Sequence, residues 1–209
     1  MFQSHNYLKE SASQTAGPYV HIGLIPNQAG FDIFRNNFGN VLVGSSTQGE
    51  RITIEGRVID GVGAPLRDVL VEIWQANSAG RYNHPADRQD KPIDDDFRGW
   101  GRAGSDFESG VYSFKTIKPG SVIGRRDHRP MAPHVNFWIV ARGINIGLNT
   151  RMYFSDEEAA NAADPVLNLI EPDTRRQTLI AQRSTRGAEI VYTFDIYLQG
   201  DRETVFIDV

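Results

Sequence analysis

The sequence contains no cysteine, which excludes a disulfide scaffold, a thiolate metal site, an iron–sulfur cluster and a cysteine nucleophile. It has no uninterrupted apolar run near the ~20 residues that a membrane-spanning helix requires. Residues 1–6 also lack the basic and apolar regions of a signal peptide, so we expect a soluble cytoplasmic protein. Acidic residues outnumber basic ones, and the formal net charge of −4 disfavours a nucleic-acid-binding function.

Glycine and proline, by contrast, are frequent, and their 20 and 10 copies in 209 residues predict many tight turns between short strands. Alternating hydrophobicity supports this interpretation, since residues 51–59 (RITIEGRVI) place Ile52, Ile54 and Val58 on one face. Five further segments are predicted to be strands: 69–74, 110–116, 134–142, 190–198 and 204–207. The pattern therefore predicts an all-β fold, an antiparallel β-sandwich.

Two short helical insertions are predicted between these strands. Ser155 and Glu158 have the spacing of a capping box, for a helix that runs to residue 163. Residues 172–183 begin with proline, which favours the first turn of a helix. The hydrophilic stretch 76–104 is predicted to be a long loop, and loops of that length usually have a function.

The N-terminal part of the chain differs from the rest. Residues 11–30 keep neither a helical nor a strand period for long, so we expect them to lie across a larger surface or another chain. Residues 31–38 (FDIFRNNF) are compatible with one or two helical turns. The chain accordingly divides into an extended N-terminal segment, residues 1–50, and a sandwich domain, residues 51–209.

Few residues are candidates for catalysis or metal binding. His134 lies in a predicted strand, and Asn136 occupies the position where a His-x-His metal pair would have its second imidazole. This incomplete pair favours a hydrogen-bonded structural histidine. Arg142 ends the same predicted strand, on the face of His134 and Asn136. Its guanidinium suits either a carboxylate ligand or a salt bridge at the strand end, and composition alone favours the salt bridge.

Two clusters of charged residues and the serines are not interpreted as metal-binding or catalytic sites. The acidic run 94–96 lacks the glycine and the distal glutamate of an EF-hand loop, so it is interpreted as a solvated loop. The basic cluster 125–129 is interpreted as a solvated turn or a partner contact. The sequence has no Gly-x-Ser-x-Gly motif for a serine nucleophile.

Several longer motifs, in order along nearly the whole chain, resemble the intradiol ring-cleavage dioxygenases. They are SQTAGPYVHIG (13–23), GAPLRDVLVEIWQANSAGRY (63–82), TIKPG (116–120), MAPHVNF (131–137), ARGINIGLNTRMYF (141–154) and RRQTLIA (175–181). The resemblance is closest to the α chain of members built from homologous α and β chains. It implies a β-sandwich in a ferric, non-haem hetero-oligomer that opens 3,4-dihydroxybenzoate with O₂, giving 3-carboxy-cis,cis-muconate.

The resemblance also implies that the iron is held by two tyrosines and two histidines of the β chain. In this chain the matching positions are Gln89, Val122, His134 and Asn136. Ferric iron is hard and prefers anionic oxygen donors, whereas these side chains offer one imidazole, two amides and an alkyl group. We therefore expect this chain to bind no metal, and Fe(III) to be bound by the partner β chain.

In the family resembled, the active site lies at the α/β interface, and the N-terminal segment of the α chain forms part of the substrate pocket. The matching residues here are Thr15, Gly17, Pro18 and Tyr19, together with Arg142, which the resemblance places near the substrate. In this context a substrate-facing Arg142 is preferred to a structural salt bridge, and residues 1–50 are expected to pack on the partner chain. The alternatives are a self-sufficient intradiol enzyme and a non-catalytic β-sandwich binding module.

Overall fold

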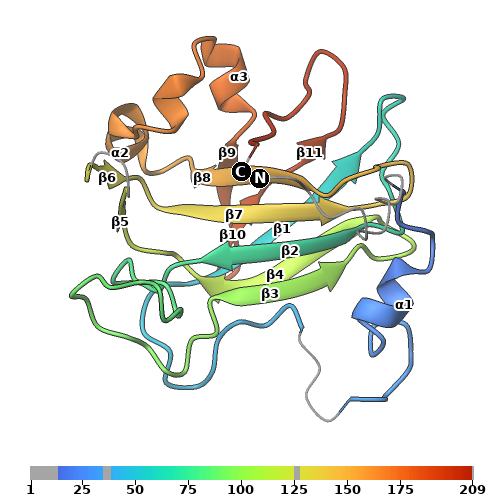
Figure 1. Cartoon of the computed structure of the whole chain (residues 1–209), viewed down its shortest axis with the longest axis horizontal. Coiled ribbons are helices and arrows are strands. Elements are labelled where there is room, and N and C mark those ends of the chain that lie inside the picture. The colour runs from blue at the N-terminus through green and yellow to red at the C-terminus, as the bar shows by residue number, and fades with distance from the viewer. Residues whose placement is uncertain (1–13, 35–38, 125–127, 209) are drawn as a thin grey trace, which may run out of the picture.

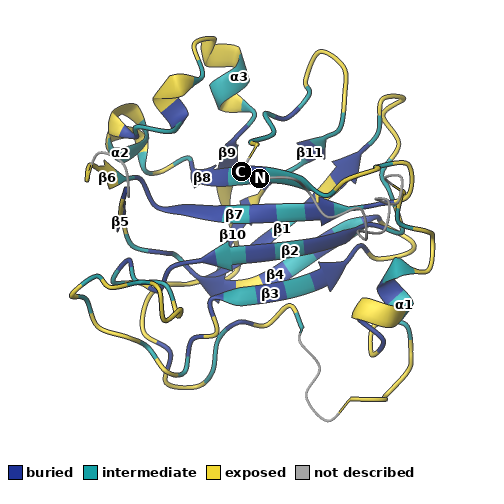
Figure 2. Ribbon diagram, viewed as in Figure 1, coloured by how far each residue is buried: buried dark blue, intermediate teal, exposed yellow. Residues whose placement is uncertain are grey.

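The computed structural model describes residues 14–34, 39–124 and 128–208. Strands dominate it, and short helices lie at its periphery (Figures 1 and 2). The strands are β1 Arg51–Ile59, β2 Leu70–Gln75, β3 Trp100–Gly104, β4 Val111–Ile117, β5 Val122–Ile123, β6 Pro130–Met131, β7 His134–Val140, β8 Leu148–Phe154, β9 Ile180–Arg186, β10 Glu189–Thr193 and β11 Ile196–Tyr197. The helices are α1 Val20–Leu24, α2 Glu158–Ala163, the 3₁₀ turn η1 Leu167–Leu169 and α3 Asp173–Gln177.

The strands form two layers with the hydrophobic core between them. One layer contains β4, β1, β10 and β9, with β11 continuing along the same edge of β1, and the other contains β8, β7, β2 and β3. Figure 1 shows β7 and β2 lying over β1 and β10. Phe137 of β7 meets Tyr112 of β4 and Phe194 across the core, with ring centroids 6.0 and 5.2 Å apart. The predicted all-β sandwich is therefore confirmed.

The sandwich is mixed, because three strand pairs are parallel. Strand β1 runs parallel to β10 and to β11, and β9 runs parallel to β8 at the junction of the two layers. The predicted strand 190–198 is interrupted between β10 and β11. At that point the Asp195 carboxylate accepts a hydrogen bond from the Arg57 amide, and the Phe194 carbonyl accepts one from the Tyr112 hydroxyl. These contacts stand in place of regular strand pairing at residues 194 and 195.

The remaining sequence predictions have mixed outcomes. Strands 51–59, 69–74, 110–116 and 134–142 are confirmed to within two residues as β1, β2, β4 and β7, whereas β8 was missed and β3 lies inside the predicted loop. The predicted strand 204–207 is wrong. That segment contacts β8 through separate hydrogen bonds, from the Ile207 amide to Asn149 and from the Thr150 hydroxyl to the Val205 carbonyl.

Both predicted helices are shorter than the sequence indicates. The capping box is wrong, because the Ser155 hydroxyl accepts a hydrogen bond from the Arg183 amide and α2 begins without a side-chain cap. The helix predicted for 172–183 ends at Gln177, and Pro172 precedes its first turn. Beyond it, Leu179 is fully buried and Ile180 pairs with β8, so tertiary burial outweighs the local helical pattern.

The N-terminal region contains α1, which the sequence did not predict, and residues 31–34 form no helical turn. The rest of the segment 31–38 lies outside the described residues. Leu42 is buried in the core and its amide donates to the Lys115 carbonyl of β4, so residues 40–43 pack on the sandwich of their own chain. The division of the chain into an N-terminal segment, 1–50, and a sandwich domain, 51–209, stays a prediction. Among the described residues, no helix is long and apolar enough to cross a membrane.

A substitution at Gly56 tests the junction that interrupts the C-terminal strand. A Cβ at this position would overlap the Phe194 carbonyl oxygen and crowd the Tyr112 hydroxyl that donates to it. We expect Gly56→Ala to lower the free energy of unfolding by about 2–3 kcal/mol, as overpacking of a core does. Urea unfolding followed by tryptophan fluorescence measures the change. Gly23→Ala is the matched control, because a Cβ there meets no atom within 4 Å; an equal loss in both variants would contradict the prediction.

Candidate functional site

The candidate residues lie at opposite ends of strand β7. His134 and Asn136 stand near its beginning, and Arg142 follows its end. Seven residues of strand extend over about 20 Å at ~3.3 Å per residue. The length of the strand therefore separates Arg142 from His134 and Asn136. The chain has two candidate regions, which we call the cavity and the rim.

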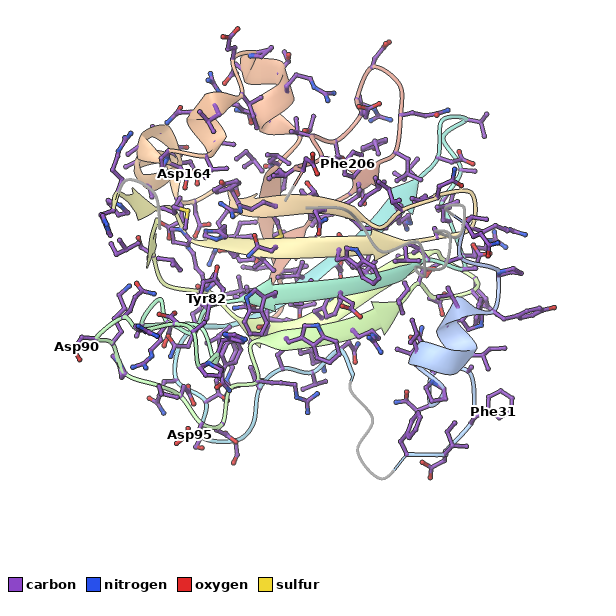
Figure 3. All side chains as sticks on the ribbon, viewed as in Figure 1. Phe31, Tyr82, Asp90, Asp95, Asp164 and Phe206 are labelled. Carbon is purple, nitrogen blue, oxygen red and sulfur yellow. The ribbon has the colours of Figure 1, made fainter. Side chains whose placement is uncertain are left out.

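The cavity is a recess of about 800 Å³ at the beginning of β7. Its walls come from the end of β2, from the chain between β2 and β3, and from β5, β7 and β8. Trp74 and Tyr82 form one wall, with ring planes within 7° of parallel and centroids 5.6 Å apart. Figure 3 labels Tyr82 at this end of the sheet, far from Phe31 beside α1. The predicted functional loop 76–104 thus contributes Tyr82 to this wall.

The four positions that the resemblance matches to iron ligands lie in or behind this cavity. His134 is 2% exposed; its Nδ1 donates to the Ala132 carbonyl at 2.7 Å, so its Nε2 accepts from the Tyr82 hydroxyl at 3.3 Å. The Gln89 amide bonds the Asp87 carboxylate and the Gly80 carbonyl. Val122 is buried in β5. These positions form a packed, hydrogen-bonded wall.

Asn136 belongs to a cross-strand pair with Arg151 of β8. The Arg151 Nε donates to the Asn136 Oδ1 at 3.0 Å, and the Asn136 Nδ2 donates to the Trp74 carbonyl at 3.2 Å. Both polar atoms of the amide are therefore engaged with protein groups. The pair holds a guanidinium cation at the wall of the cavity, next to the family's ligand positions.

This set of residues does not fit iron. A ferric ion prefers anionic oxygen donors, whereas the positions provide one buried imidazole, two engaged amides and an alkyl group. The Arg151 cation at the same wall would repel a metal ion. Across the described ranges, no three His, Cys, Asp or Glu side chains are grouped so that they could hold a metal ion. Iron chemistry therefore cannot be assigned to this chain's own residues.

The electrostatics of the cavity keep His134 neutral. Burial is the main cause that lowers its pKa, the Arg151 charge lowers it further, and together they bring it to about 4. Burial also raises the pKa of Tyr153, so its phenol stays protonated and donates to the Asp164 carboxylate at 3.1 Å. Asp164, labelled beside α2 in Figure 3, is fully buried and also accepts backbone amides of Ala132 and Leu167.

The acidic run has a structural role. The Asp94 carboxylate accepts the Gln48 amide at 2.8 Å, and the Asp96 carboxylate accepts the Ser46 amide at 2.7 Å, so the two fasten residues 44–48. Asp95 is exposed and labelled at the surface in Figure 3. Residues 125–127 of the basic cluster lie outside the described residues.

The rim brings Thr15 together with the segment around Arg142. The Thr15 hydroxyl accepts a hydrogen bond from the Gly143 amide at 2.8 Å, on the C-terminal side of Arg142. Arg142 Nη2 lies 3.3 Å from a carboxylate oxygen of Asp68, yet 64% of the arginine side chain remains exposed. An exposed ion pair of this kind contributes only ~0–1 kcal/mol. The salt bridge, which was the alternative to a substrate-facing Arg142, is present, and it leaves the guanidinium accessible.

The other rim residues are also exposed. Gly17 and Pro18 are exposed, a Cβ on Gly17 would meet no atom within 4 Å, and Tyr19 is 73% exposed at the start of α1. Exposed apolar side chains continue along this part of the chain, namely Leu24, Phe31, Ile33 and Phe34. Figure 3 shows the Phe31 ring pointing away from the body of the molecule. The rim is therefore an open surface.

Sequence analysis missed the residues that define the cavity. Tyr82 was quoted only as part of a motif, and Arg151 was not singled out because β8 was not predicted as a strand. The signal was present: in LNTRMYF, Arg151 stands between Thr150 and Met152, which are buried. A charged residue alternating with buried ones marks the open face of a strand.

This chain is similar to known proteins in sequence and in fold. The sequence model of a family described as "Dioxygenase" matches residues 36–200. The protocatechuate 3,4-dioxygenase alpha chain of Pseudomonas putida is 45% identical over 96% of this chain and 97% of its own length. The protocatechuate 3,4-dioxygenase beta chain of Burkholderia cepacia is 39% identical over 77% of this chain and 69% of its own. The structure of 3-chlorocatechol 1,2-dioxygenase from Rhodococcus opacus 1CP shares the fold, with a TM-score of 0.56 and 22% identity over 75% of this chain and 63% of its own.

The buried His134 predicts a pH-dependent stability. Its pKa is about 4 in the folded protein and ~6.5 in an unfolded chain, so between these values the unfolded state binds the extra proton. Stability is therefore lost as the pH falls from ~6.5 to ~4, by up to about 3 kcal/mol. Urea unfolding at several pH values measures the slope. His134→Gln should flatten it in this window, and an unchanged slope in that variant would contradict the assignment.

Proposed function

Because this chain belongs to the intradiol dioxygenase family, we propose that it is the non-iron α subunit of a protocatechuate 3,4-dioxygenase. In this proposal a homologous β chain binds Fe(III), and the α chain completes the substrate pocket for the cleavage of 3,4-dihydroxybenzoate by O₂ to 3-carboxy-cis,cis-muconate. The identity of 45% to an α chain over nearly its full length supports the assignment. The lower identity to a β chain supports a homologous partner.

One observation carries the proposal: the polar residues at the family's ligand positions are hydrogen-bonded to other protein groups, beside the Arg151 cation. The Asn136 amide is bonded to Arg151 and to the Trp74 carbonyl, and His134 is bonded on both ring nitrogens. A chain with this arrangement needs a partner to supply the metal. This favours the α-subunit interpretation over a self-sufficient enzyme, which would require two tyrosines and two histidines around one point.

The rim provides the groups that would contact substrate across the subunit interface. Gly17 has open space around its Cα, so the backbone can approach a ligand closely, and Pro18 stiffens the segment. Tyr19 presents an exposed aromatic ring with a hydroxyl that can hydrogen-bond. Thr15 fastens this segment to residue 143, which keeps it beside Arg142.

Arg142 is the group suited to the charge of the substrate. Its ion pair with Asp68 uses one end of the guanidinium and leaves most of the side chain exposed. A guanidinium has five N–H donors, so it can bind a second carboxylate in addition to the first. Asp68 then orients Arg142 toward the carboxylate of 3,4-dihydroxybenzoate.

Because the proposal assigns iron binding to the β chain, it predicts which preparations contain iron. Produced alone, this chain should contain no stoichiometric iron and should lack the colour of a tyrosinate–iron complex. Co-produced with the β chain, it should form a complex with one iron per β chain. Metal analysis and the visible spectrum of both preparations test this. Stoichiometric iron in the chain alone would refute the α-subunit proposal.

Kinetics of Arg142 variants test the substrate-facing role. In the αβ complex, Arg142→Ala should raise KM for 3,4-dihydroxybenzoate by about ten- to a hundredfold, because a hydrogen bond to a charged group contributes ~1.5–3 kcal/mol. Catechol lacks the carboxylate and should be affected much less. Steady-state rates on both substrates, with iron quantified in each preparation, measure the difference.

Asp68→Asn is the matched control, because it breaks the same ion pair while keeping the cation. It should shift KM for 3,4-dihydroxybenzoate by only a fewfold. If Asp68→Asn and Arg142→Ala instead affect both substrates equally, Arg142 acts through the salt bridge and its proposed role toward the carboxylate is wrong.

A further inference from the structure

The cavity at the beginning of β7 contains a cation without a matching anion. Arg151 lines it, uses its Nε on Asn136, and directs Nη1 toward the Met131 sulfur at 3.7 Å, which is a weak acceptor. Among the residues that the structure describes, no carboxylate lies within the 4 Å of an ion pair with this guanidinium. A half-buried cation without a counter-charge favours an anionic ligand.

The two carboxylates around the cavity are already engaged. Asp164 accepts the Tyr153 hydroxyl and three backbone amides, those of Ala132, Val166 and Leu167. Asp87 accepts the backbone amides of Tyr82 and Gln89 and the Gln89 side chain, and these bonds contribute to lowering its pKa. Neither forms an ion pair with Arg151; the Tyr153 hydroxyl that donates to Asp164 also interacts with the Arg151 guanidinium. Of the Asp, Glu, Lys and Arg residues in the described part of the chain, those that line the cavity are Arg88, Arg151 and Asp87.

The walls of the cavity favour a flat, apolar ligand. Trp74 and Tyr82 are stacked on each other and both line the cavity, so the stack offers a flat aromatic group against which another ring can pack. Val122, Ile123 and Met131 add apolar side chains. The volume of about 800 Å³ lies within the ~300–1,000 Å³ typical of small-molecule sites. Aromatic rings stack well on such a surface, and a guanidinium binds carboxylates through paired hydrogen bonds.

We propose that this cavity is a second, non-catalytic binding site for an aromatic monocarboxylate. The ring would lie against Trp74 and Tyr82, and the carboxylate would bind Arg151. The site is separated by the length of β7 from the rim where the proposed active site lies, and it contains none of the rim residues. The inference is argued from the cavity of this chain alone, and its test uses the αβ complex of the proposed function.

Benzoate is the probe, because it lacks the paired hydroxyls with which a catechol chelates iron. Equilibrium dialysis of radiolabelled benzoate counts the molecules bound per αβ unit in the assembled protein. Arg151→Met should remove one bound molecule per copy of this chain, or weaken that site at least tenfold. The matched control is Arg57→Met, which changes an exposed arginine of β1 that does not line the cavity and should leave the count unchanged.

A second variant covers the case in which Arg151→Met fails to fold. Ile123→Trp keeps the Asn136–Arg151 pair and fills the cavity from β5, where Ile123 is partly exposed, so it should also remove one bound molecule. Benzamide, a neutral ring of the same shape, should bind at least tenfold more weakly than benzoate, and inorganic phosphate should not compete at equal concentration. An unchanged count in Ile123→Trp, equal binding of benzamide, or equal competition by phosphate would each overturn the proposal.

Discussion

The hydrogen bond from Arg151 to Asn136 determines what the cavity of this chain can hold. It joins β8 to β7 and fixes a cation beside the positions where the family places its metal ligands. That charge disfavours a metal ion, helps to keep the neighbouring His134 neutral, and leaves the cavity suited to anions. One cross-strand pair thus separates the chemistry of this chain from that expected of its partner.

The fold lets the two ends of β7 serve separate purposes. The hydrogen-bonded wall at the beginning of the strand is packed against the core, whereas the rim beyond its end carries exposed side chains from two distant parts of the sequence. The Thr15 hydroxyl joins these parts, because it accepts a hydrogen bond from the Gly143 amide and donates one to the Ala141 carbonyl. A substitution at the exposed rim can therefore leave the buried wall at the other end intact.

Much of the sandwich could be predicted from local patterns, because β2, β4 and β7 alternate over most of their length between buried and more open positions, and the apolar residues of β1 are buried. The errors fall where long-range contacts decide. Leu179 enters the core although its surroundings have a helical pattern, and residues 204–207 have a strand pattern but no ladder to join. The resemblance identified Gln89, Val122, His134 and Asn136, but the partner of Asn136 could not be found without knowing that β8 pairs with β7 in that register.

The pairing of β1 with the late strands β10 and β11 has a consequence for how the chain folds during synthesis. Strands β2, β3, β7 and β8 lie within residues 70–154, so one layer can form early on the ribosome. Strand β1 pairs with β4 along one edge, but its other edge stays open until β10 and β11 emerge, more than 130 residues later. An open edge of a hydrophobic strand is a site for wrong pairing. The nascent chain is therefore exposed to misassembly until residues 180–197, which contain β9, β10 and β11, have emerged to close the sandwich.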